Sequence, residues 1–339
     1  MATNDHLPPF LQALLQPEPY DHPAPGIKLV QTHISSVILA GDYVYKFKKP
    51  VNFGFLDFSD LEKRRVCCEQ EVLLNRRLCP DIYLGLIAVT AEPGGGYALN
   101  GTGPVVEYGV KMARLPEERM MVHLIRAGAL DAGHIDALVA VLADFYRRAE
   151  NGPEIGRFGT AAAVAVNVLE NFEQTRLFVG QGALDQEQFD GIADYARTFL
   201  GNEALFQHRV EGGSIRDCHG DLYSANICLA DKVYIYDCIE FNQRFRYCDV
   251  ASDVAFLVMD LEFHGLDGLA ARFIDRFVQA TADRGLMTML DFYKCYRAYV
   301  RGKIGLFTAA DPAVDPAVQA ASIEQAGQYF RLAQRYATR

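Results

Sequence analysis

The chain has 339 residues, of which 50% are hydrophobic and 22% charged, and its formal net charge is −10. This composition suits a globular protein with one large domain or two lobes, and the negative charge argues against a nucleic-acid backbone as the main partner. No apolar stretch approaches the roughly 18 residues that cross a membrane, and the first residues lack the basic-then-apolar order of a secretion signal. We therefore expect a cytoplasmic protein with no membrane or nucleic-acid partner, and the oligomeric state is left open.

The first part of the chain predicts a small antiparallel sheet. Residues 1–26 are rich in proline and predicted to be irregular. A helix is expected over residues 61–78, with Ser59 or Asp60 as its N-cap. Strands are expected over residues 27–32, 36–39, 43–48, 82–90, 97–99 and 104–112, with turns at Gly41-Asp42 and Gly94–Gly96. Residues 27–112 thus form a predicted N-lobe.

The rest of the chain predicts a larger, mainly helical C-lobe over residues 113–339. A hinge near Met112–Pro116 connects the two lobes. Helices are expected over residues 117–127, 135–149, 161–178, 186–201, 266–284 and 289–306. The predicted fold class is therefore α/β (α+β), with a sheet-containing lobe followed by a helical one.

The stretch from Ile215 to Asp237 carries the most specific motif. His219, Asp221 and Asn226 form H-x-D-x-x-x-x-N, and Asp237 follows eleven residues after Asn226. The catalytic loop of protein kinases has this spacing: its Asp is the base, its Asn binds magnesium, and a later Asp holds the metal under the phosphates. Short strands around an Ala230–Lys232 turn would bring Asp237 back beside Asn226. We therefore expect ATP and Mg²⁺ as cofactors, Asp221 as the catalytic base, and Asn226 and Asp237 as metal ligands.

The strand over residues 43–48 supplies the expected phosphate-binding lysine. Lys46, in V-Y-K-F, fits the strand lysine that contacts the α- and β-phosphates. Its acidic partner is expected on the helix over residues 61–78, where helical periodicity favours Glu71 over Glu69. The alternative is that Lys46 and its neighbouring lysines form a solvated strand end.

The phosphate-covering loop departs from the protein-kinase pattern. No G-x-G-x-x-G is present, and the equivalent turn reads Thr32-His33-Ile34-Ser35-Ser36. Backbone N–H groups and the hydroxyls of Ser35 and Ser36 are candidates to cap phosphates, although an ordinary hairpin is the competing interpretation. Met112, at the hinge, is a further candidate nucleotide contact.

These motifs resemble the aminoglycoside phosphotransferase and choline kinase superfamily, a branch of the protein-kinase-like fold. The H-G-D-L loop has Gly220 where protein kinases favour Arg. Residues 44–65, 107–120 and 236–262 are similar to the kinase-like first half of bacterial bifunctional proteins whose second half is a P-loop kinase. This chain contains no G-x-x-x-x-G-K-[ST], so we expect the P-loop activity to be absent from it.

The resemblance also implies supporting residues. Asp249 and Asp253 are expected to support the catalytic loop, and His219 is expected to pack beneath it. Glu240 is expected either near a second magnesium or paired with Arg244 or Arg246. A salt-bridged helix surface is expected for Tyr293, Arg297 and Arg301.

The favoured function is transfer of the γ-phosphoryl group of ATP to a hydroxyl of a small molecule. Residues after 115 hold 31 Asp+Glu against 22 Lys+Arg, and an acidic cleft attracts cations. An amino-bearing acceptor is therefore one expectation, with a neutral sugar or nucleoside as the alternative. The carboxylates behind this expectation are Asp249, Asp253, Asp260, Glu262 and Asp267. A nucleotide-binding sensor without turnover and a kinase acting on protein are the rival functions.

Overall fold

A computed structural model describes residues 7–312 and 314–338, and the chain divides into two compact units. The first unit comprises the chain up to Met120 together with Tyr234–Asn242, and the second comprises Met121–Val233 and Gln243–Arg339. The segment Tyr234–Asn242 therefore groups with the sheet-containing unit, whereas the sequence places it in the C-lobe. Residues 1–6 of the N-terminal segment predicted to be irregular lie outside the described residues.

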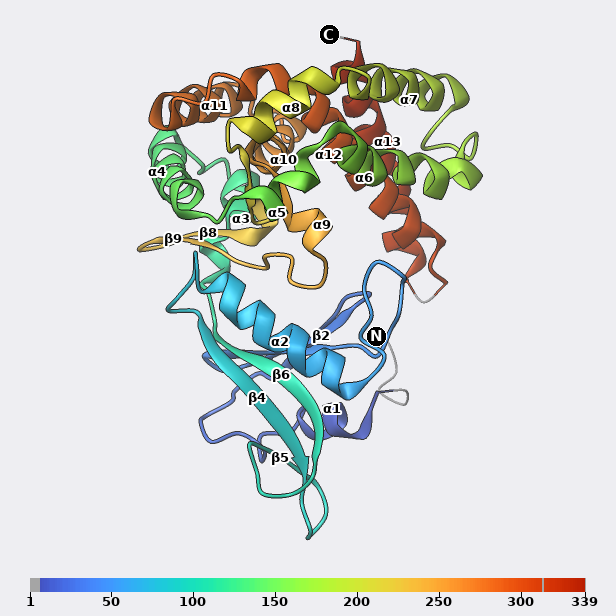
Figure 1. The fold of residues 1–339 in the computed structure, drawn as a ribbon. Helices are drawn as coiled ribbons and strands as arrows, with labels where there is room; N and C mark the ends of the chain where they lie inside the picture. Colours follow the sequence, from blue (N-terminus) through green and yellow to red (C-terminus); the bar gives the residue numbers. More distant parts are fainter. Residues whose placement is uncertain (1–6, 313, 339) are drawn as a thin grey trace. The chain divides into compact units, whose positions relative to one another are not determined.

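The first unit contains a six-stranded antiparallel sheet with strand order β1-β2-β3-β6-β4-β5 (Figure 1). All six strands lie where the sequence predicts them. Gly41 has a positive φ of 60° in the turn between β2 and β3, a conformation that glycine adopts without strain. The strands are β1 (Lys28–Gln31), β2 (Ser35–Ala40), β3 (Tyr43–Lys48), β4 (Tyr83–Ala91), β5 (Tyr97–Leu99) and β6 (Val105–Ala113).

The sheet has two different faces because successive strand residues point to opposite sides. On β3, Tyr45 and Phe47 join an apolar core, so Lys46 and Lys48 point to the other face. Helix α2 (Leu61–Asn75) packs on β4 and β6 (Figure 1). Its N-cap is Asp60, whose side chain accepts a hydrogen bond from the Lys63 N–H at 2.8 Å.

The N-terminal segment is less irregular than predicted. Residues Pro9–Ala13 form a short helix, α1, because a proline fits the first helical turn. Leu11 and Leu14 from this segment belong to the apolar core of the sheet, and the Tyr20 hydroxyl donates to the Leu14 carbonyl at 2.6 Å. The segment therefore covers the apolar sheet face.

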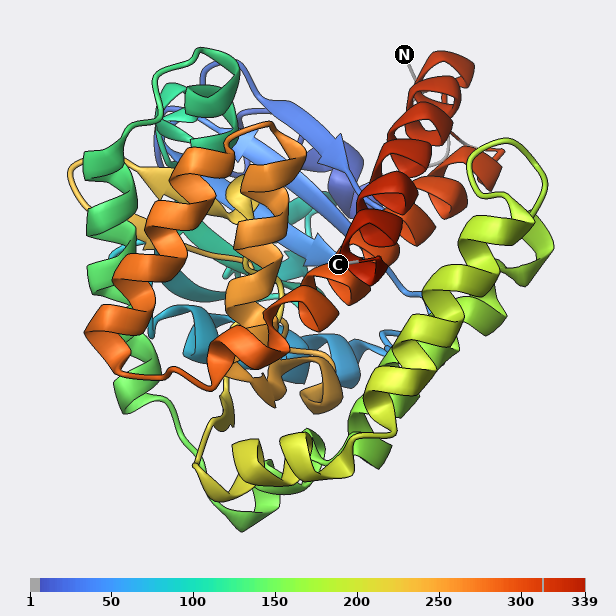
Figure 2. The same cartoon turned by 90° about the horizontal axis from the view of Figure 1, so that it is seen from above.

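The second unit is mainly helical. Helix α13 lies along α12, as the red helix pair in Figure 2 shows. Its longer helices are α4 (Ala132–Arg148), α6 (Ala161–Thr175), α7 (Gln186–Leu200), α8 (Glu203–Glu211), α10 (Val250–Phe263), α11 (Asp267–Thr281), α12 (Leu286–Ala310) and α13 (Pro316–Ala337). Shorter helices are α3 (Met121–Arg126), α5 (Pro153–Gly156) and α9 (Gln243–Arg246), and single 3₁₀ turns are η3 (Arg157–Gly159), η4 (Arg176–Phe178) and η5 (Ser224–Asn226). A 3₁₀ turn of the first unit, η2 (Glu117–Arg119), precedes α3.

Three of the longer helices, α8, α10 and α13, are absent from the sequence prediction, as are the short helices α5 and α9. Helix α10 is buried over Val250–Leu261, so its sequence lacks the polar stripe that marks an amphipathic helix. No helix among the described residues combines the length and the apolar character needed to span a membrane.

Short strands frame the catalytic motif. Strand β7 (Ile215–Asp217) pairs antiparallel with β10 (Tyr247–Asp249). Strands β8 (Ile227–Leu229) and β9 (Val233–Ile235) lie where the sequence predicts them, and the Ala230 N–H donates to the Lys232 carbonyl in the turn between them.

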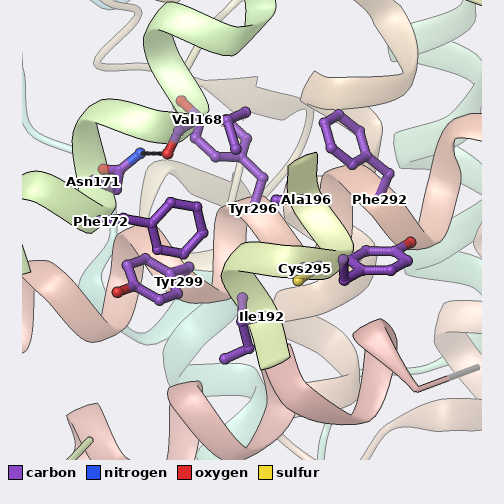
Figure 3. Close-up of a pocket in the computed structure, with 10 residues that line it drawn as sticks. Val168, Asn171, Phe172, Ile192, Ala196, Phe292, Cys295, Tyr296 and Tyr299 are labelled. Carbon is purple, nitrogen blue, oxygen red and sulfur yellow. Dashed lines mark hydrogen bonds between the residues drawn. The ribbon is translucent and has the colours of Figure 1, made fainter. Parts of the chain in front are cut away.

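One small cavity in the helical unit is a packing feature rather than a binding site. Figure 3 shows it among Phe172, Ile192 and Phe292, and its volume is about 10 Å³. A single water molecule needs about this much space, so the cavity is too small for a substrate.

Candidate active site

Lys46 lies at the centre of a group of ion pairs in the first unit. Its Nζ is 2.8 Å from Glu71 Oε1 and 2.5 Å from Asp237 Oδ1. The Glu71 side chain is fully buried, whereas that of Asp237 is 43% exposed. Glu69, the alternative partner from the sequence, pairs with Arg65 instead. Of the two candidates, Glu71 is therefore the one in contact with Lys46.

The ion pairs decide the charge state of this group. Burial alone would lower the pKa of Lys46, but attraction to Asp237 and Glu71 raises that pKa well above its ordinary value. Burial alone would raise the pKa of Glu71, but Lys46 and Lys48 hold it below its ordinary value. Both side chains are therefore charged at neutral pH.

Asp237 is held in an uncommon backbone conformation. Its φ is +62°, a left-handed value that few residues other than glycine adopt and that often marks functional positions. Its N–H donates to the Tyr83 hydroxyl at 3.2 Å, and the next N–H, of Cys238, donates to Asn75 Oδ1 at 2.9 Å. These bonds direct the partly exposed carboxylate toward Lys46.

Lys48 and Glu240 extend this group in a way that the sequence prediction missed. Lys48 Nζ is 2.5 Å from Glu71 Oε2 and also forms an ion pair with Glu240. The expected arginine partners of Glu240 are wrong, because Arg244 pairs with Glu170 and Arg246 pairs with Asp217. The two-residue repeat of a strand, which places Lys48 on the same face as Lys46, is the signal that identifies it.

The two candidate serines lie on opposite faces of β2. Ser35 is opposite Lys48 in the β2–β3 register, so its side chain shares the lysine face, whereas Ser36 is opposite Phe47 on the core-lined face. Both serines are buried, and Ser35 Oγ has no hydrogen-bond partner among the described residues. In the preceding turn, the Ser35 N–H donates to Thr32 Oγ1 at 3.0 Å. The geometry argues against a phosphate contact by the Ser36 hydroxyl and leaves Ser35 as the better-placed candidate.

Met112 lies on the lysine face as well. It is buried in β6 and is the register partner of Val44, two residues before Lys46. Val110 is the partner of Lys46 itself. The lysine face thus continues across β6 as an apolar surface, and the nucleotide contact of Met112 stays a prediction.

In the second unit, Asp221 and Asn226 contact each other directly. Asn226 Nδ2 donates to Asp221 Oδ2 at 2.9 Å and to the Asp221 carbonyl at 3.0 Å. Among the described residues, no hydrogen bond uses Asn226 Oδ1. The Asp221 N–H donates to Nδ1 of His219, which is fully buried. The loop thus presents one carboxylate and one amide oxygen from a fixed backbone.

Asp253 holds the backbone of this loop. Its carboxylate accepts hydrogen bonds from the His219 N–H at 2.8 Å, the Gly220 N–H at 2.9 Å and the Tyr146 hydroxyl at 2.9 Å. Asp249 supports the loop indirectly, through the helix that carries Asp253. It accepts from both Arg209 Nε and Nη2 and from the Ala251 N–H, and so caps the helix that carries Asp253.

Arg297 also supports the loop, and the surface role expected for its helix face is wrong. Arg297 is 6% exposed and donates to the Gly220 carbonyl at 3.0 Å. Tyr293, on the same face of α12, is buried too. One turn later, the Arg301 guanidinium lies 4.8 Å from the centre of the Tyr223 ring, two residues after Asp221. Helix α12 therefore supports the catalytic loop.

The acidic residues after the loop do not form a solvated cleft. Asp249 and Asp253 have the structural partners described above, and Asp260 is buried and accepts from the Ser224 N–H at 3.0 Å. Glu262 pairs with Lys294 at 3.1 Å and accepts from the Tyr336 hydroxyl. Only Asp267 of the five is exposed. Four of the five carboxylates therefore do not support the expectation of an acidic cleft that attracts an amino-bearing acceptor.

The candidate metal ligands fit Mg²⁺ chemically. Magnesium prefers oxygen ligands and is typically held by one or two carboxylates together with substrate phosphates. Asp237 offers a partly exposed carboxylate, and Asn226 offers Oδ1. Within residues 7–312 and 314–338, no three His, Cys, Asp or Glu side chains gather into a metal site. All eight cysteines are free thiols.

The sequence has relatives without an established activity. No family model matches the chain. An uncharacterised protein of Mycobacterium tuberculosis is 36% identical over 282 residues, which are 83% of this chain and 55% of that protein, and one of Mycobacterium bovis matches to the same extent. The chain thus spans about half the length of the curated relatives it matches.

Two solved structures illustrate the fold that the chain shares with known proteins. A choline/ethanolamine kinase family protein from Mesorhizobium loti aligns over 94% of both chains with a TM-score of 0.51 and 11% identity. An amicoumacin kinase in complex with AMP-PNP, Ca²⁺ and Ami aligns over 96% of this chain and 92% of that one, with a TM-score of 0.52 and 12% identity. At these identities the likeness establishes the fold alone. The chain therefore has the kinase-like α/β fold of these proteins, which is the fold that its catalytic-loop sequence predicts.

Proposed function

We propose that the protein is an ATP- and Mg²⁺-dependent phosphotransferase that moves the γ-phosphoryl group to a hydroxyl of a small molecule. The observation that carries the proposal is that the candidate phosphate-binding residues are in contact within the first unit, and the candidate catalytic-loop residues are in contact within the second. Lys46, Glu71 and Asp237 are in contact in the first unit, and Asp221 contacts Asn226 in the second. The likeness to small-molecule kinases supports the same reaction class.

Each residue has a separate role in this proposal. Asp221 would accept the proton of the acceptor hydroxyl, and Lys46 would bind the nucleotide phosphates. Asn226 and Asp237 would hold Mg²⁺, which supplies charge neutralisation at the phosphates when bound. Glu71 would orient Lys46. Such catalysis consists mainly of positioning and electrostatic stabilisation.

Magnesium-dependent nucleotide binding tests the proposal directly. A ligand present at one hundred times its dissociation constant stabilises the fold by about 2.7 kcal/mol. We expect ATP to raise the melting temperature in the presence of Mg²⁺, and Asp237→Ala to remove the magnesium-dependent part of the shift. An equal shift in Asp237→Ala would refute the metal assignment.

Turnover separates the proposal from its rivals. A panel of metabolites and aminoglycosides, assayed for acceptor-dependent ATP consumption, should contain at least one substrate class. Binding of ATP without turnover on any acceptor would favour a nucleotide sensor, and phosphorylation of protein alone would favour a protein kinase. The intact Asp221–Asn226 pair favours turnover over a sensor. We place the activity in the cytoplasm, consistent with the free thiols.

A further inference from the structure

Lys48 occupies a position that the proposed reaction does not require. The phosphate-binding role belongs to Lys46, yet Lys48 is the more deeply buried of the two, with a side chain 1% exposed against 14%. Its Nζ lies between Glu71 and Glu240, whose side chains are 0% and 4% exposed. The Phe58 ring, centred 5.4 Å away, covers it further.

Burying three ionisable side chains is costly. Each ion loses its hydration on folding, and a buried pair seldom stabilises a protein more than apolar side chains of similar size would. Stability therefore does not explain why the ionisable side chains of Lys48, Glu71 and Glu240 are buried together. In some proteins, buried ionic groups are retained because they specify a defined geometry.

The contacts of Lys48 join three separate segments of the first unit. Lys48 belongs to β3, Glu71 to α2, and Glu240 to the segment Tyr234–Asn242. Glu240 follows Asp237 by three residues. The Lys48–Glu240 ion pair thus ties the segment that carries the candidate metal ligand to the strand that carries the candidate phosphate ligand.

We propose that Lys48 is a positioning residue that fixes the Asp237 segment on the first unit through Glu240 and keeps Glu71 directed at Lys46. This inference rests on the proposed function for its effect on nucleotide binding, but not for its structural part. Groups that orient metal ligands typically change metal affinity or activity about 10–100-fold when they are removed.

Two variants test the proposal. Lys48→Met keeps a long apolar side chain against Phe58 and removes the charge. Glu240→Ala releases the segment while leaving the Lys48–Glu71 pair intact, so it avoids an unpaired buried lysine if Lys48→Met fails to fold. The matched controls are Lys63→Met, a lysine of α2 that is 45% exposed, and Glu62→Ala on the same helix turn.

Two measurements are made on each full-length variant. Amide hydrogen exchange of residues 234–242 reports on the segment itself, and calorimetry reports the affinity for AMP-PNP with and without Mg²⁺. We expect both test variants to exchange faster in this segment and to bind Mg²⁺·AMP-PNP about 10–100-fold more weakly. The magnesium-independent affinity should change less, and the controls should match the wild type.

The outcomes separate the two levels of the proposal. Unchanged exchange in a folded Lys48→Met or Glu240→Ala protein would overturn the positioning role. Faster exchange with wild-type Mg²⁺·AMP-PNP affinity would overturn the link to the metal ligand. If the wild type itself binds no nucleotide, the proposed function fails, while the exchange data still decide whether Lys48 fixes the segment.

Discussion

The lysine group of the first unit and the catalytic loop of the second are held by different interactions. Lys46 and Lys48 are positioned by ion pairs between side chains, with Glu71 shared by both. The loop around Asp221 is positioned by its own backbone, whose N–H groups donate to Asp253 and whose Gly220 carbonyl accepts from Arg297. The first arrangement depends on a balance of charge, whereas the second depends on single buried partners. The two regions should therefore respond differently to pH and to truncation.

The largest effect is expected at the loop's own carboxylate. Asp221→Asn keeps the shape of the side chain but removes its basicity. General-base assistance contributes about 10²–10⁴-fold, so turnover should fall by that factor while Mg²⁺·ATP affinity changes little. Steady-state rates and calorimetry measure the two effects. Asp267→Asn, at an exposed position, is the control, and loss of ATP binding in folded Asp221→Asn would show that Asp221 binds the nucleotide instead.

Truncation of a buried partner should come next. Asp253→Ala removes the carboxylate that accepts hydrogen bonds from three donors, on His219, Gly220 and Tyr146. An unsatisfied buried donor costs about 1–3 kcal/mol, so the free energy of unfolding should fall by at least about 3 kcal/mol. Urea denaturation provides the measurement, with Asp275→Ala on the exposed side of α11 as the control. A loss below 1 kcal/mol, on the order of one hydrogen bond, would contradict this role of Asp253.

The charge-dependent region should respond to pH through Glu71. The pKa of Glu71 lies below its ordinary value of 4.5 in the folded protein. Its ionised form therefore stabilises the fold at pH values above 4.5, and this contribution is lost as the pH falls through the folded pKa. The stability difference between wild type and Glu71→Gln should shrink from about pH 7 to about pH 4. Equal stability differences at both pH values would show that the ion pairs of Glu71 with Lys46 and Lys48 do not stabilise the fold.

The smallest effect, with the opposite sign, is expected at Lys303. Unlike Lys48, it has no ion-pair partner among the described residues, donates to Gln174 at 2.8 Å, and burial lowers its pKa to about 8. The charged form is therefore disfavoured on folding, and stability should rise with pH between about 8 and 10.5. Lys303→Met should stabilise the protein by about 0.5–2 kcal/mol at neutral pH, whereas Lys48→Met should destabilise it. A destabilised Lys303→Met would indicate that the Gln174 bond outweighs the buried charge.

Local patterns in the sequence predict the sheet and the pairing of Lys46 well. Strand alternation and turn residues define β1 to β6, and helical periodicity favours Glu71 over Glu69. The Asp221–Asn226 spacing is equally local, since both residues lie in one short loop. These features depend on residues near each other in the chain.

The features that the sequence prediction missed depend on distant partners. Helix α10 is buried on all sides and shows no amphipathic pattern. Asp249 and Asp253 support the loop as expected, but together with Asp260 they also count toward the expected acidic cleft, and all three carboxylates accept hydrogen bonds within the fold instead. Glu240 finds a lysine 192 residues away rather than the nearby arginines. Charge counts along the chain therefore could not identify the partners or the acceptor.

The return of Tyr234–Asn242 to the first unit has a consequence for folding during synthesis. The ribosome delivers the chain from its N-terminus, and domains usually fold as they emerge. The sheet can form once Met120 has left the ribosome, but Lys48 then lacks Glu240 and Lys46 lacks Asp237. Contacts between residues so far apart form late. More than a hundred further residues must therefore be synthesised after Met120 before Lys46 and Lys48 meet Asp237 and Glu240. A nascent chain stalled before residue 234 would lack these two carboxylates.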